Sequence, residues 1–304
     1  MNGIVMRSTG SFYDVLATDG KKYNCLVRGK IRLEGIKETN PIAVGDCVSF
    51  HLDNEIGSIT EILPRKNHML RQSVKKTGHA HVLAANIDQT LLVVTVASPR
   101  TSIGFIDRFL VSAESFRIPQ VVLFNKKDIL DEGGRQKQDE LVALYDSIGV
   151  TSLSVSALHE DQKEVMALLQ GKTTLIAGHS GVGKSTLVNK LLPGLEQKIG
   201  EISNFSDKGI HTTTFAEMFQ VDEKTFIIDT PGVKEWGLVD MNEQEISDYL
   251  PEMRDLRLQC KFGSRCIHVN EPKCAIIEAV KAGHIALSRY ESYLSMVLGE
   301  DNRK

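Results

Sequence analysis

The clearest candidate for chemistry is a glycine-rich segment between an apolar run at 173–177 and an amphipathic run at 185–192. It has the spacing G-x-x-x-x-G-K-S and consists of Gly178, His179, Ser180, Gly181, Val182, Gly183, Lys184 and Ser185, with Thr186 next. Glycines let backbone N–H groups close around phosphate oxygens, and a helix that starts there adds positive potential. Lys184 can reach the β- and γ-phosphates, and the Ser185 hydroxyl can ligate Mg²⁺. The segment therefore predicts a nucleotide site.

An Asp-x-x-Gly motif, Asp229 and Gly232, follows the apolar run 226–228. An aspartate at the carboxyl end of a parallel strand lies at the ligand edge of the sheet, where it can hold Mg²⁺ through water. The Gly232 N–H can contact a γ-phosphate and release it after hydrolysis. The motif is weak alone, but beside a phosphate loop it indicates a nucleotide switch.

A third motif follows the apolar run 121–124 and has the pattern Asn-Lys-x-Asp: Asn125, Lys126, Lys127 and Asp128. The Asp128 carboxylate can accept hydrogen bonds from guanine N1–H and the 2-amino group, which adenine does not offer in that arrangement. Unpaired polar groups in a site can discriminate by about 10⁴–10⁵. Ser156 and Ala157 can supply a backbone N–H to guanine O6. Beside the phosphate loop, this pattern favours a GTPase over an ATPase or kinase; alone it would be a polar turn.

The order of these motifs is permuted, because the guanine motif precedes the phosphate loop. The segment between the loop and Asp229 contains His211 and Thr213. Thr213 is our candidate for completing the Mg²⁺ shell, although the register is open. Val233 occupies the place where Ras-type enzymes have a water-orienting glutamine. His211 can take that catalytic role by its chemistry, or it can be a loop histidine without one.

Near the carboxyl end, four soft ligands cluster: Cys260, Cys266, His268 and Cys274. Three cysteines and one histidine suit a tetrahedral, closed and structural Zn²⁺ site, although the spacing is not that of a standard finger. The chain has 5 cysteines, an odd number that argues against a disulfide framework. Cys25 and Cys47 are expected to be small buried hydrophobic residues.

Three domains are expected around these motifs. Residues 1–68 contain short alternating strands and a hairpin signal at Asp19 and Gly20, which predict an OB-like or SH3-like barrel, structural or RNA-binding. Residues 65–81 are basic and without a period, and are expected to be a solvated linker or a phosphate-contacting arm. Alternating strands and helices over 69–240 predict an α/β GTPase domain. Residues 241–304 are expected to be helical around the zinc ligands.

Composition sets the broad class. The chain has 304 residues, 41% of them hydrophobic and 25% charged, with a formal net charge of −3. These values suit two or three globular domains and exclude a disordered, fibrous or histone-like protein. The start of the chain does not resemble a signal peptide, and no apolar stretch is long enough to cross a membrane. A cytoplasmic protein without membrane contact is expected.

Together the motifs resemble one family over nearly the whole chain, the ribosome small-subunit-dependent GTPase A (RsgA) family. The resemblance rests on NKKD at 125–128, GHSGVGKST at 178–186, HTTT at 211–214, DTPG at 229–232 and CKFGSRCIHVNEPKC at 260–274. It implies an OB-fold N-terminal domain, a circularly permuted GTPase domain and one structural zinc. It also implies a late role in small-subunit assembly, with GTP hydrolysis to GDP stimulated by that subunit.

Within that resemblance, His211 matches the histidine implicated in hydrolysis, and the partners are the small subunit and its rRNA, bound by a monomer. Two positions depart from the family pattern: five residues instead of four separate Cys260 from Cys266, and Ile210 replaces a basic residue before His211. Three rivals remain open at this stage. They are an RNA-binding assembly module with a passive nucleotide site, a P-loop ATPase or kinase, and a permuted GTPase acting on another RNA.

Overall fold

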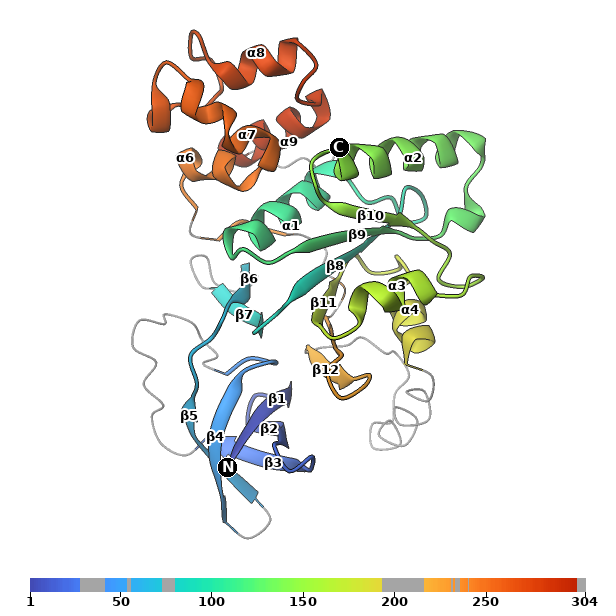
Figure 1. Cartoon of the computed structure of the whole chain (residues 1–304), viewed down its shortest axis with the longest axis vertical. Helices are drawn as coiled ribbons and strands as arrows, with labels where there is room; N and C mark the ends of the chain where they lie inside the picture. The colour runs from blue at the N-terminus through green and yellow to red at the C-terminus, as the bar shows by residue number, and fades with distance from the viewer. Residues whose placement is uncertain are drawn as a thin grey trace.

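A computed structural model describes residues 1–27, 42–53, 56–72, 80–192, 216–230, 232, 236–239 and 241–299 (Figure 1). The first five strands form a closed barrel: β1 (Asn2–Ser8), β2 (Phe12–Ala17), β3 (Lys22–Val27), β4 (Cys47–Asp53) and β5 (Ile56–Ile62). Their order is β1-β2-β3-β5-β4, and β4 pairs back onto β1. This is the five-stranded barrel expected of an OB-like domain. Its core contains Val5, Val15, Cys25 and Phe50, all fully buried.

The segment after the barrel corrects one expectation. Residues 68–72 are not a solvated linker, because β6 (His68–Gln72) pairs antiparallel with β7 (Ala80–Ala85). Met69 is fully buried and Leu70 is 8% exposed, so two apolar residues within a basic run are enough to draw it onto the core. A bulge between them lets both face inward. Residues 73–79 lie outside the described part of the chain, so the phosphate-contacting arm is untested.

The central domain is a sheet with helices on both faces, as the alternating pattern predicts. Its order is β10-β9-β8-β11-β13-β12, in which only the β12–β13 pair is antiparallel. The strands are β8 (Gln89–Val94), β9 (Gln120–Phe124), β10 (Thr151–Ser154), β11 (Thr173–Ala177), β12 (Glu217–Gln220) and β13 (Phe226–Asp229). The helices are α1 (Ile103–Ser115), η1 (Lys127–Ile129), α2 (Glu132–Ser147), α3 (Lys163–Leu169) and α4 (Lys184–Leu191). Helices α1 and α2 cover one face, and α3 and α4 cover the other (Figure 1).

The barrel and the central sheet are one continuous sheet, which the sequence did not indicate. Strand β1 pairs antiparallel with β12, where Arg7 lies opposite Glu217. A bulge between Val5 and Arg7 turns the strand at this point. Val5 therefore packs in the barrel core, whereas Met6 packs in the core under α1. The barrel is thus joined to β12, whose other neighbour is β13, the strand that ends at Asp229 of the Asp-x-x-Gly motif.

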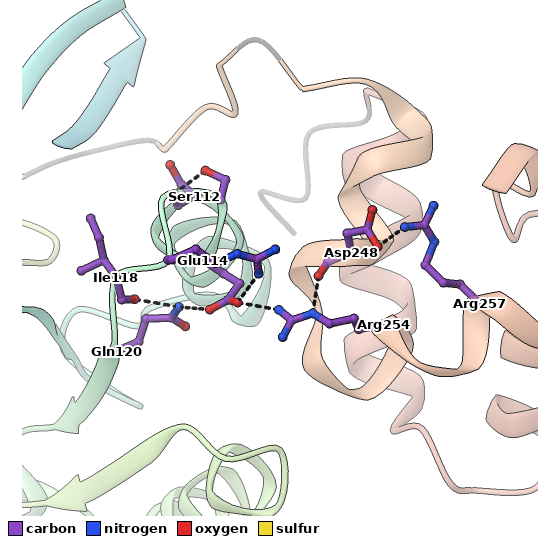
Figure 2. Close-up of polar contacts among 9 residues, drawn as sticks. Ser112, Glu114, Ile118, Gln120, Asp248, Arg254 and Arg257 are labelled. Atoms are coloured by element: carbon purple, nitrogen blue, oxygen red, sulfur yellow. Dashed lines mark hydrogen bonds and ion pairs between the residues drawn. The ribbon is translucent and has the colours of Figure 1, made fainter. Parts of the chain in front are cut away.

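The C-terminal segment is helical, as expected, and packs on α1. It contains α6 (Glu243–Ile246), η2 (Ser247–Tyr249), α7 (Pro251–Arg254), η3 (Leu256–Gln259), η4 (Gly263–Arg265), α8 (Ala275–Lys281) and α9 (Leu287–Val297). Val111 of α1 belongs to its hydrophobic core. Glu114 of α1 accepts a hydrogen bond of 2.5 Å from Arg254. Figure 2 draws this contact and the ion pair of Arg257 with Asp248. Among the described helices, none is long and apolar enough to cross a bilayer.

Candidate nucleotide site and metal centre

The sheet brings the separated motifs to one edge. The glycine-rich loop follows β11, Asn125 follows β9, Ser156 follows β10, and Asp229 ends β13. These four strands are parallel to one another, so their carboxyl ends meet at the edge where α/β sheets bind ligands. The motifs therefore meet at one edge of the sheet, although the guanine motif precedes the phosphate loop in the chain.

Glycine is required at two positions of the phosphate loop. A Cβ on Gly178 would lie 2.2 Å from the Val93 carbonyl oxygen, and one on Gly183 would lie 2.3 Å from Asn125 Nδ2. Both residues also have positive φ, +148° and +97°, which other residues rarely adopt. The loop can therefore bring its backbone close to a ligand, with α4 starting directly after Gly183.

Lys184 is buried, with 8% of its surface exposed, and its Nζ is already hydrogen-bonded within the loop. It donates to the carbonyl oxygens of Gly178 and His179, both at 2.8 Å. Burial lowers the pKa of Lys184, and the nearby Asp229 carboxylate opposes that effect. Ser185, in the first turn of α4, is exposed, so its hydroxyl is open to a ligand.

Asn125 has a structural role that the motif alone did not indicate. Its side-chain amide donates to the Val182 carbonyl at 2.8 Å, and its carbonyl accepts from the Ala157 N–H at 2.8 Å. These two hydrogen bonds tie the phosphate loop to the loop after β10, and the residue is buried, with 2% exposed. The Ala157 N–H, which we expected to face a base, is therefore engaged within the protein. The Ser156 N–H is engaged in the same way by Glu160, at 2.8 Å.

The Asp128 carboxylate lies at the surface beside this cluster, with 24% of its side chain exposed. A hydrogen bond from the Ser156 side chain is the main cause of its lowered pKa. His159 Nε2 lies 3.7 Å from Asp128 Oδ2, a neighbour that sequence reasoning missed. The two motif lysines are held beside it: Lys126 donates to the Ser98 carbonyl at 2.7 Å, and Lys127 pairs with Glu160 at 2.6 Å.

Asp229 has the environment of a cation-binding carboxylate. Its Oδ1 is buried and has no hydrogen-bond partner in the described part of the chain. Burial raises the pKa of Asp229 to about 6, Lys184 opposes the rise, and Glu217 adds to it. A buried carboxylate oxygen of this kind suits Mg²⁺ held directly or through water. A Cβ on Gly232 would lie 3.0 Å from the Ser180 backbone, so the Asp-x-x-Gly motif abuts the phosphate loop. His211 and Thr213 lie outside the described residues.

Helix α1 contacts both the phosphate loop and Trp236, another feature that the sequence did not reveal. Phe105 packs against His179 of the phosphate loop, with ring centroids 3.9 Å apart and the ring planes tilted by 32°. One turn later, Phe109 packs edge-on against Trp236, with centroids 4.8 Å apart. Trp236 is the chain's only tryptophan and lies four residues after Gly232. Trp236, which follows the Asp-x-x-Gly motif in the chain, is therefore anchored on α1.

The four predicted metal ligands converge in the C-terminal segment. The four ligand atoms lie within 4.8 Å of one another, and all four residues are buried: Cys260, Cys266, His268 and Cys274. The Sγ–Sγ distances from Cys274 are 3.7 and 3.8 Å, and His268 Nδ1 lies 3.3 and 3.5 Å from two of the sulfurs. A tetrahedral ion with bonds of about 2.3 Å to sulfur and about 2.0 Å to nitrogen requires separations of about 3.8 and 3.6 Å. Four of the six separations lie close to these values, and the cluster can hold one metal ion.

The loop around these ligands is held by groups outside the cluster. Glu271 accepts backbone N–H bonds from Ile267, Val269 and Asn270 at 2.7, 2.8 and 3.0 Å. The Tyr290 hydroxyl donates to the His268 carbonyl at 2.7 Å. The long spacing between the first two cysteines is taken up by η4, which lies between them. Such supporting contacts fix the orientation of ligands.

Comparisons with known proteins identify the family. The model of the RsgA GTPase family matches residues 62–239, and that of the RsgA N-terminal domain matches residues 2–59. The small ribosomal subunit biogenesis GTPase RsgA of Bacteroides fragilis is 49% identical over 306 residues, covering 100% of this chain and 98% of the relative. The Flavobacterium johnsoniae protein of the same name is 45% identical, covering 99% and 94%.

Solved structures point to the same family. The crystal structure of YjeQ from Thermotoga maritima superposes with a TM-score of 0.77 at 35% identity, covering 100% of this chain and 99% of that one. The structure of YloQ, described as a circularly permuted GTPase, gives 0.73 at 29% identity, covering 100% and 96%. The chain therefore belongs to the RsgA GTPase family and is a GTP-hydrolysing enzyme with a circularly permuted fold.

Proposed function

We propose that this GTPase binds the small ribosomal subunit and its rRNA, and acts late in the assembly of that subunit. Its relatives carry the name of small ribosomal subunit biogenesis GTPases. We further propose that the subunit stimulates hydrolysis of GTP to GDP and phosphate. GTP would order the segments around the nucleotide, and hydrolysis would loosen them and release the protein. The protein would work as a cytoplasmic monomer.

The observation that carries the nucleotide chemistry is the double hydrogen bond of Asn125. It joins the phosphate loop to the loop after β10, which supports a single site built from motifs far apart in the chain. In that site, Asp128 would pair with the guanine base, and Lys126 and Lys127 would flank it. The phosphates would lie on the backbone of residues 178–186, with Lys184 turning from its carbonyl partners to the phosphate oxygens.

Magnesium would be held by Ser185, by Asp229 through water and by Thr213, with Gly232 contacting the γ-phosphate. When bound, the ion would neutralise charge on the phosphate oxygens. His211 is our candidate for orienting the attacking water, since Val233 cannot do so. In the C-terminal segment, Zn²⁺ would be the structural ion, because three thiolates and an imidazole gathered in a buried cluster suit it.

We propose three domains: a barrel over 1–68, the GTPase domain over 69–240 and a zinc-binding helical domain over 241–304. The barrel and the helical domain would contact rRNA on either side of the GTPase domain. A salt titration of subunit binding with a GTP analogue is expected to show a steep slope, because each neutralised phosphate releases counterions. A flat slope would argue against direct contact with the RNA backbone.

The decisive experiment is GTP turnover by the purified protein, alone, with small subunits and with large subunits. Small subunits are expected to raise turnover, and large subunits to leave it at the basal rate. ATP is expected neither to turn over nor to compete with GTP. Lys184→Ala provides the background rate. Equal stimulation by both subunits would refute the proposed partner and leave the GTPase assignment standing.

A further inference from the structure

A row of charged side chains crosses the sheet from the nucleotide site into the barrel. In the pairing of β12 with β13, Glu217 lies directly opposite Asp229. In the pairing of β1 with β12, Arg7 lies directly opposite Glu217, and on the barrel side Asp14 of β2 lies opposite Arg7. Directly opposed residues project from the same face of a sheet. Asp229, Glu217, Arg7 and Asp14 therefore share one face.

The neighbouring residues show which face this is. Met218 and Ile228, the alternate positions, are buried in the core under α1 together with Met6. Ile227, which shares a face with Asp229, is buried against Leu187 of α4. The row therefore lies on the side of α4, the helix that begins with Lys184. The bulge between Val5 and Arg7 gives Arg7 this orientation.

The charges along the row are not all of one sign, and each one acts on its neighbours. Asp229 faces Lys184 on one side and the like charge of Glu217 on the other. Glu217 in turn faces Arg7, with Asp14 and Lys22 of the barrel beyond it. Two carboxylates directly opposite each other repel, which is destabilising unless a cation lies near them. Burial adds to this cost and raises the pKa of Glu217, while Arg7 opposes that rise.

We propose that Glu217 is a positioning residue for the magnesium-bound nucleotide, and that Arg7 of the barrel opposes it. The charge of Glu217 adds to that of Asp229 and strengthens the attraction of the site for Mg²⁺. Arg7 offsets part of that charge, so the barrel sets the affinity of the site for the cation. This inference rests on the proposed magnesium site at Asp229 and adds two residues that none of the nucleotide motifs contains.

The test measures the release of GDP labelled with an N-methylanthraniloyl group, as a function of Mg²⁺ concentration and without any turnover. Glu217→Gln is expected to need about two- to fivefold more Mg²⁺ to slow release half-maximally, the range for a cross-strand charge pair. Arg7→Gln is expected to need less Mg²⁺ than wild type, by up to about twofold because it is one strand further away. Glu217→Asp, which keeps the charge, is expected to stay close to wild type.

Two matched substitutions control for charge alone. They are Glu223→Gln and Arg135→Gln. Glu223 lies in the turn after β12 and Arg135 lies on α2, and both side chains are exposed and outside the row. Both are expected to leave the Mg²⁺ dependence unchanged. Shifts of opposite sign for Glu217→Gln and Arg7→Gln support the proposal. Shifts of the same sign, or none beyond the controls, overturn it while the magnesium site stands. A wild-type release rate indifferent to Mg²⁺ overturns both.

Discussion

Arg289 of α9 forms an ion pair with Asp107 of α1, and both side chains are buried, with 1% and 0% exposed. Arg289 also pairs with Glu252 at 2.7 Å, and the Tyr145 hydroxyl donates to Asp107 at 2.9 Å. Burial disfavours the charged guanidinium, but the two carboxylates outweigh it and raise the pKa of Arg289. The helical segment that carries the metal ligands is therefore joined to the GTPase core by a desolvated charge network.

Replacing Arg289 by methionine is expected to destabilise the protein by about 3–5 kcal/mol, because two carboxylates stay buried without their cation. Urea unfolding, followed by circular dichroism, measures the loss. Arg117→Met is the control, since Arg117 pairs with Glu114 at the surface with 64% of its side chain exposed. That change is expected to cost less than about 1 kcal/mol. Equal losses for the two variants would show that burial of the Arg289 network adds nothing to the free energy of unfolding.

Replacing Asp128 by asparagine is expected to change base preference from guanine to xanthine. The asparagine amide would donate toward the 2-oxo group of xanthine, whereas it meets the 2-amino group of guanine donor to donor. GDP affinity is expected to fall by about 10²-fold or more, and xanthosine diphosphate to gain. Competition against labelled GDP measures both. Asp131→Asn is the control, because asparagine can replace Asp131 as the N-cap of α2. Unchanged GDP affinity in Asp128→Asn would exclude Asp128 from the base site.

Much of this architecture follows from the sequence because it depends on local patterns. The continuous apolar runs that became β8, β9 and β11 predict buried parallel strands, and the motifs directly after them must meet at one edge. Three cysteines and a histidine close together in the chain predict a metal-binding cluster, because a shared metal ion is the simplest arrangement that uses all four side chains. In each case the residues that carry the signal are neighbours in the chain.

What the sequence did not indicate depends on contacts between distant segments. The pairing of Arg7 with Glu217 joins strands 210 positions apart, and nothing in either segment names its partner. Strand β6 was missed because its basic neighbours outweighed two apolar residues. The bracing role of Asn125 was hidden because the motif suggests base contact, while both the nitrogen and the oxygen of its buried amide are hydrogen-bonded to protein.

Asp229 gives a pH dependence with a defined sign. Burial raises its pKa to about 6, so in the nucleotide-free protein the carboxyl takes up a proton as the pH falls through that value. Mg²⁺ needs the carboxylate, and the Mg²⁺-dependent part of GDP affinity is therefore expected to fall by about tenfold per pH unit below 6. Calorimetry at pH 6 in two buffers of different ionisation enthalpy is expected to show proton release on binding. Asp229→Asn is expected to abolish that release, and a pH-independent affinity in the wild type would contradict the assignment.

The raised pKa also has a consequence for stability. The folded state of the nucleotide-free protein holds the Asp229 proton at a pH where the unfolded chain has lost it. This contribution to stability is fully present below the unfolded pKa of about 3.9 and disappears as the pH rises through about 6. The difference in unfolding free energy between wild type and Asp229→Asn is therefore expected to change across this window. Urea unfolding at several pH values measures it, and a constant difference would contradict a raised pKa.

The metal centre makes a stoichiometric prediction that includes Cys260, the ligand with unusual spacing. Elemental analysis is expected to find one zinc per chain, and Cys260→Ser is expected to lose it, because the Cys260 sulfur lies 3.5 Å from His268 Nδ1 and 3.7 Å from Cys274 Sγ. Burial raises the pKa of the Cys266 thiol to about 12, so its thiolate needs the cation. Removing it is expected to loosen the core that contains Ile276 and Val111. Cys47→Ser, in the barrel, is the matched control and is expected to keep its zinc. Full zinc content in Cys260→Ser would mean that the site is completed by another group.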